Sequence, residues 1–316
     1  MKYALFLIVL TLMLPLASCS HSTSHGPKPH VVVSLPVMQY FVDRLTQDSV
    51  EVTVMVPSGA DHDTYSPKPN QMRRLASANA YLALGSLEFE RTWHQRLTAA
   101  APYMTWFQLT DSIDLITGHQ HHDHSNFCNH DNPDAPTVDA DPHFWLSPLQ
   151  AKRLCVNMAH CLSTIAPQFA DSIDVQLQAL VHDLDSLHTK LTHVVNSHPN
   201  LAFVIYHPAL GYVQRDYGLT QLVVGSEGVS VRPMHFAQMT DSARRAGVRV
   251  IFLQQGYSPE RLETMANEIG AHIVPIQPED YDYMTTMDHI ISSLDQMTTD
   301  PVATSSVPPT NSQSAQ

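Results

Sequence analysis

Residues 167–195 read PQFADSIDVQLQALVHDLDSLHTKLTHVV, and this stretch decides how the rest of the chain is arranged. Its apolar residues recur every three or four positions and so lie on one side of an α-helix about five turns long. They are Leu177, Leu180, Leu184, Leu187, Leu191 and Val194. A helix of this length is suited to act as a stiff connector. We therefore predict a single rigid helix, within residues 166–198, that joins two lobes.

On both sides of this helix, short apolar runs alternate with amphipathic segments. Before it, the sequence predicts strands at 30–35, 50–56, 80–84 and 104–109, and helices at 38–46, 67–78, 87–100 and 148–162. After it, strands are predicted at 201–206, 221–224, 248–253 and 272–276, and helices at 209–216, 234–246, 259–269 and 280–297. Regular alternation with continuous apolar strands favours parallel sheets covered by helices. The predicted class is α/β, with Rossmann-like lobes at 30–165 and 199–297.

Composition sets the first limits on function. The chain has 316 residues, of which 43% are hydrophobic, enough for a core in each of two domains. Its formal net charge is −13, and it contains no tract of basic residues. Nothing in the sequence would neutralise the phosphates of a nucleic acid, so we expect no nucleic-acid partner. An acidic surface suits a cation as the ligand.

The N-terminus is typical of export. Residues 1–19, MKYALFLIVLTLMLPLASC, combine one early cation, an apolar run and small residues before a cysteine. This pattern predicts a secretory signal and is too short for a comfortable membrane span. The segment LASC at 16–19 resembles a bacterial lipobox, in which Cys19 is lipidated; an ordinary signal peptide is the alternative. We expect an extracytoplasmic lipoprotein, periplasmic or at the cell surface, that contacts the membrane only through its lipid anchor.

Two further segments and the other cysteines have simpler interpretations. Residues 20–29 predict a flexible tether, and residues 298–316 predict a disordered tail. Cys155 and Cys161 are six residues apart in a helical pattern, on different faces, so we expect buried free thiols rather than a disulfide. Cys128 lies in a polar loop and is either an auxiliary metal ligand or an idle thiol.

That polar loop, at 118–142, reads GHQHHDHSNFCNHDNPDAPTVDADP and interrupts the alternation of strands and helices. It holds too few aliphatic residues to build a core. Imidazole and carboxylate groups at this density favour metal binding, and a solvated loop without a ligand is the alternative. The expected auxiliary weak ligands are His119, His121, His122, His124 and His130.

Three histidines elsewhere fall where an open parallel sheet binds its ligands, beyond the carboxyl ends of the strands. His62 follows the predicted strand 50–56, and His207 directly follows the predicted strand 201–206. His143 enters from the segment that connects the lobes. For each histidine alone, a capping or surface role is the alternative. Their joint placement predicts a metal site in the cleft between the lobes.

The motifs around these histidines carry a family resemblance. They are VPSGADHDTYSP at 56–67, DPHFWL at 141–146 and YHPALGY at 206–212. These motifs resemble those of the metal-binding lipoproteins that serve zinc and manganese ABC importers, and the His-rich loop resembles the zinc-uptake branch. The resemblance covers almost the whole mature chain, including the long helix. It implies a fourth ligand that is either water or a carboxylate after a late strand, for which Glu279 is the best match and Asp280 the next.

The expected function is extracytoplasmic capture of a divalent ion and its delivery to an ABC permease and its ATPase, by a monomer that is not an enzyme. Three imidazoles with a water or carboxylate suit Zn(II), whereas Mn(II), which remains possible as cargo, prefers more oxygen ligands. A zinc-dependent hydrolase is the main alternative, but the sequence lacks His-Glu-x-x-His and Gly-x-Ser-x-Gly motifs. A metal-binding surface adhesin is the other alternative.

Overall fold

The structure, a computed structural model, describes residues 28–117, 140–225 and 233–299. Within these ranges it contains two four-stranded sheets, and every strand pair in them is parallel. The strand orders are β2-β1-β3-β4 and β6-β5-β7-β8, so both sheets have the same topology. The predicted fold, two α/β lobes joined by a long helix, is confirmed.

The N-terminal lobe is built before the long helix. Its elements are β1 (His30–Val33), α2 (Pro36–Thr46), β2 (Glu51–Val54), α3 (Pro69–Leu75), β3 (Ala80–Ala83), α4 (Glu88–Ala100), β4 (Thr105–Gln108), the 3-10 turn η1 (His143–Leu146) and α5 (Pro148–Ile165). All four residues of β1 and all four of β3 are buried, as expected for central strands covered on both faces.

The C-terminal lobe follows the long helix. Its elements are β5 (Ala202–Ile205), α7 (Gly211–Tyr217), β6 (Thr220–Val223), α8 (Pro233–Arg245), β7 (Val250–Gln254), α9 (Glu260–Ile269), β8 (His272–Ile276) and α10 (Tyr283–Thr299). Helix α10 begins three residues later than predicted, because residues 277–282 form a turn in which the Asp280 N–H donates to the Gln277 carbonyl. It ends at Thr299, two residues into the segment predicted as a tail.

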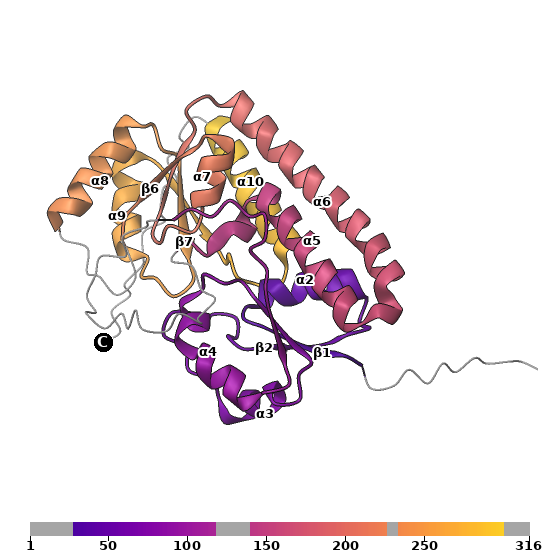
Figure 1. Cartoon of the computed structure of the whole chain (residues 1–316). Helices are drawn as coiled ribbons and strands as arrows, with labels where there is room; N and C mark the ends of the chain where they lie inside the picture. Colours follow the sequence, from indigo (N-terminus) through magenta and orange to yellow (C-terminus); the bar gives the residue numbers. More distant parts are fainter. Residues whose placement is uncertain (1–27, 118–139, 226–232, 300–316) are drawn as a thin grey trace, which may run out of the picture.

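The connector begins with a 3-10 turn, η2 (Pro167–Phe169), and continues as α6 (Ala170–Ser197). Its 28 residues span about 42 Å. The predicted stripe is buried from Leu180 onward, and Leu177 is half-buried. Helix α6 packs against α2 and α5 on one lobe and α10 on the other. Figure 1 shows it running along one side of both lobes, which makes it a common support.

The two lobes share most of one hydrophobic core. On β5, Phe203 and Ile205 face the core that also contains the N-terminal strands, whereas Ala202 and Val204 face a smaller cluster under α8 and α9. This is the period of two expected of a strand buried on both faces. The inner face of the C-terminal sheet is therefore continuous with the N-terminal lobe.

The two cysteines of α5 and the start of this helix are both buried in the structure. Cys155 and Cys161 are buried and free, as predicted, and burial raises the pKa of the Cys161 thiol to about 11. Ser147 is the N-cap residue of α5, but its hydroxyl donates to Asp216 Oδ2 at 2.6 Å instead of capping the helix. Because Asp216 belongs to α7, this bond joins the two lobes. No helix in the described ranges is long and apolar enough to span a membrane.

Candidate metal centre

The three predicted histidines meet at the junction of the lobes. His62 lies in the loop between β2 and α3, His143 opens η1, and His207 lies just beyond β5. Together with Glu279, from the turn after β8, they line a cavity of about 230 Å³. The three histidines are almost fully buried, with exposed fractions of 4%, 4% and 8%. The cavity therefore has an imidazole wall screened from bulk water.

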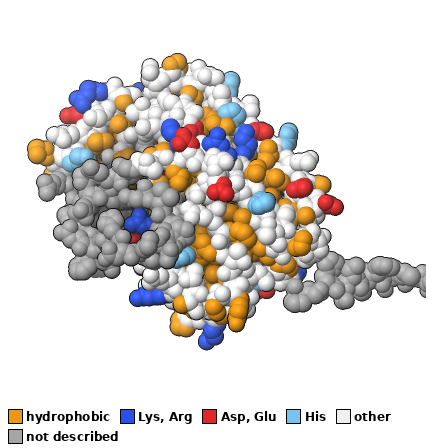
Figure 2. All heavy atoms as spheres, in the orientation of Figure 1, with side chains coloured by type: hydrophobic (Ala, Val, Ile, Leu, Met, Phe, Trp, Pro, Cys, Tyr) orange, Lys and Arg blue, Asp and Glu red, His pale blue; other side chains and the backbone are white. Residues whose placement is uncertain are grey.

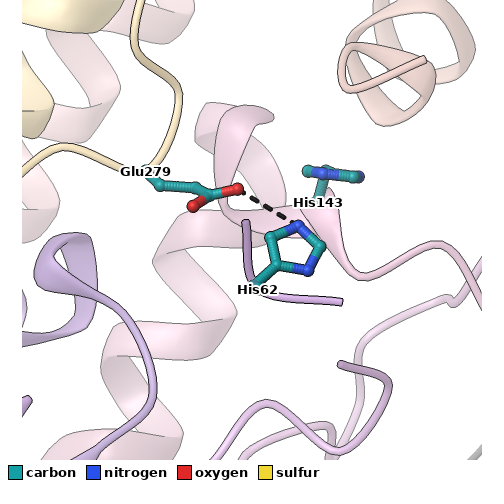
Figure 3. A group of neighbouring side chains, drawn as sticks. All are labelled: His62, His143 and Glu279. Atoms are coloured by element: carbon teal, nitrogen blue, oxygen red, sulfur yellow. Dashed lines mark ion pairs between the residues drawn. The ribbon is translucent and has the colours of Figure 1, made fainter. Parts of the chain in front are cut away.

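The distances define a close group of donor atoms. One potential ligand atom each from His62, His143 and Glu279 lies within 4.8 Å of the other two. His62 Nε2 is 3.1 Å from Glu279 Oε1, and Figure 3 shows these two side chains pointing toward each other. His207 is not part of this set, but its ring is centred 5.1 Å from that of His143. The structure thus brings together all three predicted histidines and one of the two predicted carboxylates.

Two aspartates fix the orientation of the first two imidazoles. His62 Nδ1 is 2.8 Å from Asp63 Oδ1, and His143 Nδ1 is 2.8 Å from Asp141 Oδ1. Because an ionised carboxylate can only accept, each Nδ1 carries the hydrogen and donates it. In the neutral imidazole, Nε2 is then the atom with a free lone pair. This carboxylate–imidazole arrangement is the one that orients histidine ligands in metal sites.

His207 is positioned through its backbone by the neighbouring strand of its own sheet. Gln254, at the end of β7, accepts from the His207 N–H at 3.1 Å and donates to the His207 carbonyl at 2.9 Å. Strands β5 and β7 flank the point where the strand order of this sheet reverses, the usual ligand site of such a sheet. Tyr257 lies parallel to the imidazole ring with centroids 6.5 Å apart.

The electrostatics differ sharply between the histidines. Burial, together with the nearby His143 and His62, lowers the pKa of His207 to about 3, so this imidazole is neutral at physiological pH. Burial also acts to lower the pKa of His62, but hydrogen bonds to the Asp63 and Glu279 carboxylates outweigh it and hold that pKa well above its ordinary value. The two carboxylates therefore favour the protonated form of His62 in the metal-free protein.

The two candidate carboxylates have different surroundings. Glu279 Oε1 faces His62, as described above. Asp280 lines the same cavity, but its Oδ1 accepts hydrogen bonds from the Ser58 hydroxyl at 3.1 Å and from the Tyr281 N–H at 2.9 Å. Asp280 thus stabilises the turn, while Glu279 points at the imidazoles.

Sequence reasoning missed four residues of this site: Asp63, Asp141, Gln254 and Trp145. The first two could have been found, because each is within two positions of a predicted histidine and a carboxylate is the common partner of a metal-bound imidazole. The contacts of Gln254 with the His207 backbone, and of the Trp145 indole N–H with the Pro278 carbonyl at 3.0 Å, are long-range and leave no local signal. Other predictions fall outside the described residues: the auxiliary histidines His119, His121, His122, His124 and His130, together with Cys128 and the lipidation site Cys19.

Comparison with known proteins agrees with this architecture. Residues 31–297 match the model of the family described as "Zinc-uptake complex component A periplasmic". The high-affinity zinc uptake system protein ZnuA of Bacillus subtilis (strain 168) is 24% identical over 283 residues, which cover 85% of this chain and 86% of that protein. The zinc-binding lipoprotein AdcA of Streptococcus pneumoniae (strain ATCC BAA-255 / R6) is 22% identical over 88% of this chain, which spans only 55% of AdcA.

Solved structures give the same result. A crystal structure of ZnuA aligns with a TM-score of 0.75 and 29% identity, covering 86% of this chain and 99% of that one. The periplasmic zinc-binding protein TroA from Treponema pallidum aligns with a TM-score of 0.71, 16% identity and the same coverage, and supports the fold.

The family match covers most of the chain and confirms three of the predictions made from the sequence. The protein is a component of a zinc-uptake complex, it is not an enzyme, and it acts outside the cytoplasm. The chain belongs to the family of periplasmic A components of zinc-uptake complexes.

Proposed function

We propose that this protein captures Zn(II) in the inter-lobe cavity, with His62, His143, His207 and Glu279 as its ligands. The observation that supports this most directly is the group of donor atoms from His62, His143 and Glu279, all within 4.8 Å of one another although they come from remote parts of the chain. His207 adds a neutral imidazole from the other lobe.

The donor set suits zinc. Three imidazole nitrogens and one carboxylate oxygen complete the tetrahedral coordination that Zn(II) prefers, whereas Mn(II) favours more oxygen donors and a higher coordination number. Glu279 is the better candidate for the oxygen ligand, because Asp280 is held by Ser58 and by the backbone of the turn.

The delivery step follows from the family. We infer that the loaded protein docks as a monomer on an ABC permease, whose ATPase drives import. A lipid on Cys19 and the tether at 20–29 would keep it close to that permease. The histidines of the loop 118–142 would hold additional zinc weakly and raise its concentration near the cavity.

Zinc titration of the mature protein tests the ligand set. We expect one tight site, which His143→Ala, His207→Ala and Glu279→Gln each weaken by at least tenfold because one donor is lost. His188→Ala is the matched control, since His188 lies on α6 and its Nδ1 is 2.9 Å from the Tyr217 hydroxyl. Wild-type affinity in the three site variants would contradict the proposal.

A further inference from the structure

The turn that carries Glu279, residues 277–282, belongs to the C-terminal lobe by sequence but is bonded to the N-terminal lobe. The Val37 N–H, in the first turn of α2, donates to the Glu279 carbonyl at 3.1 Å. The indole N–H of Trp145, in η1, donates to the Pro278 carbonyl at 3.0 Å. The backbone on either side of the Glu279 side chain is thus held by two N-terminal elements. We call this segment the Glu279 turn.

Side-chain contacts extend this attachment. The Tyr281 hydroxyl donates to Asp43 Oδ2 at 3.0 Å, and its ring packs edge-on against Tyr40 of α2 at 5.7 Å. Tyr283, the first residue of α10, is 1% exposed and packs against Phe41 at 4.8 Å. Tyr281 and Tyr283 both pack on residues of α2. The Glu279 turn is therefore held against that helix at more than one point.

His207 is held differently. Its backbone is fixed by two hydrogen bonds to Gln254, which belongs to the same C-terminal sheet. The four candidate ligands therefore do not divide between the lobes as the sequence order suggests. His62, His143 and Glu279 form one unit attached to the N-terminal lobe, and His207 faces that unit from the C-terminal sheet.

Trp145 is the residue that joins the parts of this unit. It is fully buried, its ring centre lies 5.4 Å from that of His143, and its N–H reaches the residue before Glu279. A buried indole N–H without an acceptor is unfavourable, so the bond to the Pro278 carbonyl is strongly favoured once the ring is packed. The packing of Trp145 therefore fixes the Pro278 end of the turn, in addition to the contacts that the turn makes with α2.

We propose that Trp145 is a positioning residue for metal capture. By holding the Pro278 carbonyl, it keeps the Glu279 carboxylate beside His62, so that the N-terminal lobe presents three preorganised donors before His207 completes the site. This inference rests on the function proposed above. Ligands that are already in place bind a metal more tightly, because the cost of ordering them is not subtracted from the binding free energy.

The test is a double-mutant cycle between Trp145→Phe and Glu279→Gln. Phenylalanine keeps an aromatic ring in the core but removes the N–H. We expect Trp145→Phe to weaken zinc binding about 10- to 100-fold, the usual effect of losing a group that orients a ligand. In the Glu279→Gln background, the same change should weaken binding by less than about threefold, because Trp145 acts through Glu279. Trp93→Phe, on α4, is the matched control and should leave the zinc affinity unchanged.

The outcomes separate this inference from the proposed function. If Glu279→Gln weakens binding while Trp145→Phe binds zinc like the wild type, the positioning role is wrong and the ligand set stands. Full additivity of the two losses would show that Trp145 acts through His143 packing instead, and would also overturn the inference. If Glu279→Gln itself has no effect, the ligand assignment fails. A far-ultraviolet circular dichroism melt of each metal-free variant establishes that it is folded.

Discussion

Asp141 illustrates how one side chain prepares a ligand. Its Oδ1 accepts from both the backbone N–H of His143, at 2.9 Å, and the Nδ1–H of the same residue, at 2.8 Å. Its Oδ2 lies against Gly211, where a Cβ atom would approach to 2.7 Å. Glycine at 211 is therefore required for α7 to approach the carboxylate so closely. The imidazole of His143 is held in one orientation, in which Nε2 is the nitrogen whose lone pair is free to bind a metal.

This arrangement makes Asp141→Asn informative. The variant keeps the shape of the side chain but removes the negative charge that stabilises a metal-bound imidazole. We expect zinc affinity to fall about 10- to 100-fold. Asp183→Asn, on the surface of α6 beside Arg44, is the control and should bind zinc like the wild type. The change is measured by competition with a zinc chelator of known affinity, and equal affinities in both variants would argue against the role of Asp141.

The histidine pKa values predict how capture depends on pH. Because hydrogen bonds to Asp63 and Glu279 raise the pKa of His62 beyond the opposing effect of burial, zinc competes with a proton for this imidazole. His207, with a pKa of about 3, needs no deprotonation. The ordinary histidine value alone predicts that affinity falls only below about pH 6.5. The raised pKa of His62 moves the start of that decline to higher pH.

We therefore expect zinc affinity to fall about tenfold for each unit of pH below the pKa of His62, as one proton competes with one ion. Calorimetric titrations at pH 7.5 and 5.5 measure this decline. Repeating the pH 7.5 titration in two buffers of different ionisation enthalpy measures the protons released. Affinity that is the same at both pH values, with no proton release, would contradict this account of the site.

Among the individual residues of the site, the sequence predicts the three histidines but not the contacts that hold them in place. His62, His143 and His207 stand beside prolines or in polar turns after strands, and that local pattern identifies them. The choice between Glu279 and Asp280 is not local, because it depends on Val37, Ser58 and Trp145, which meet the turn only after both lobes have packed. No spacing rule within residues 277–282 contains that information.

Among the elements, α6 gives the clearest link from sequence to stability. Its buried stripe packs on α2, α5 and α10, and its exposed side forms ion pairs such as Arg44–Asp183 and Lys190–Asp288. Figure 2 shows acidic and basic side chains interspersed on one face of the molecule. Exposed pairs of this kind each contribute at most about 1 kcal/mol, so burial of the stripe is the larger effect.

A single substitution in the stripe tests this. Leu184 is fully buried, whereas Val175, on the same helix, is 62% exposed. We expect Leu184→Ala to lower the free energy of unfolding by about 2–5 kcal/mol, because it leaves a cavity, and Val175→Ala to change it by less than about 0.5 kcal/mol. Denaturant titration of the metal-free variants gives both values. If the two variants lost similar amounts of unfolding free energy, burial of the apolar stripe would not be what holds α6 against the two lobes.

The alternation of strands and helices is predictable because burial on both faces leaves continuous apolar runs in the strands. The ends of elements are less predictable. The sequence predicts that the last helix begins at residue 280, where Asp280 and Asp282 suit a helix N-terminus. It begins at Tyr283 because the preceding residues are bonded to α2 and η1 of the other lobe. Tertiary contacts decide that boundary.

Across the whole molecule, the His-rich loop and the cavity are separate features, and their zinc sites should be separable. We expect deletion of residues 119–130 to remove weak zinc sites while the tight site is retained, since that segment contains none of the four proposed ligands. Zinc stoichiometry by elemental analysis after dialysis, combined with titration, distinguishes the two classes. Loss of the tight site on deletion would mean that the cavity is not where zinc binds most strongly.

Imidazoles from both lobes are expected to bind one and the same ion. Zinc K-edge X-ray absorption tests it on the variant lacking residues 119–130, loaded with one equivalent of zinc. We expect three imidazole nitrogens and one carboxylate oxygen at about 2.0–2.2 Å, and the loss of one imidazole in His207→Ala. A spectrum that His207→Ala leaves unchanged, or one that contains a sulfur ligand, would contradict it.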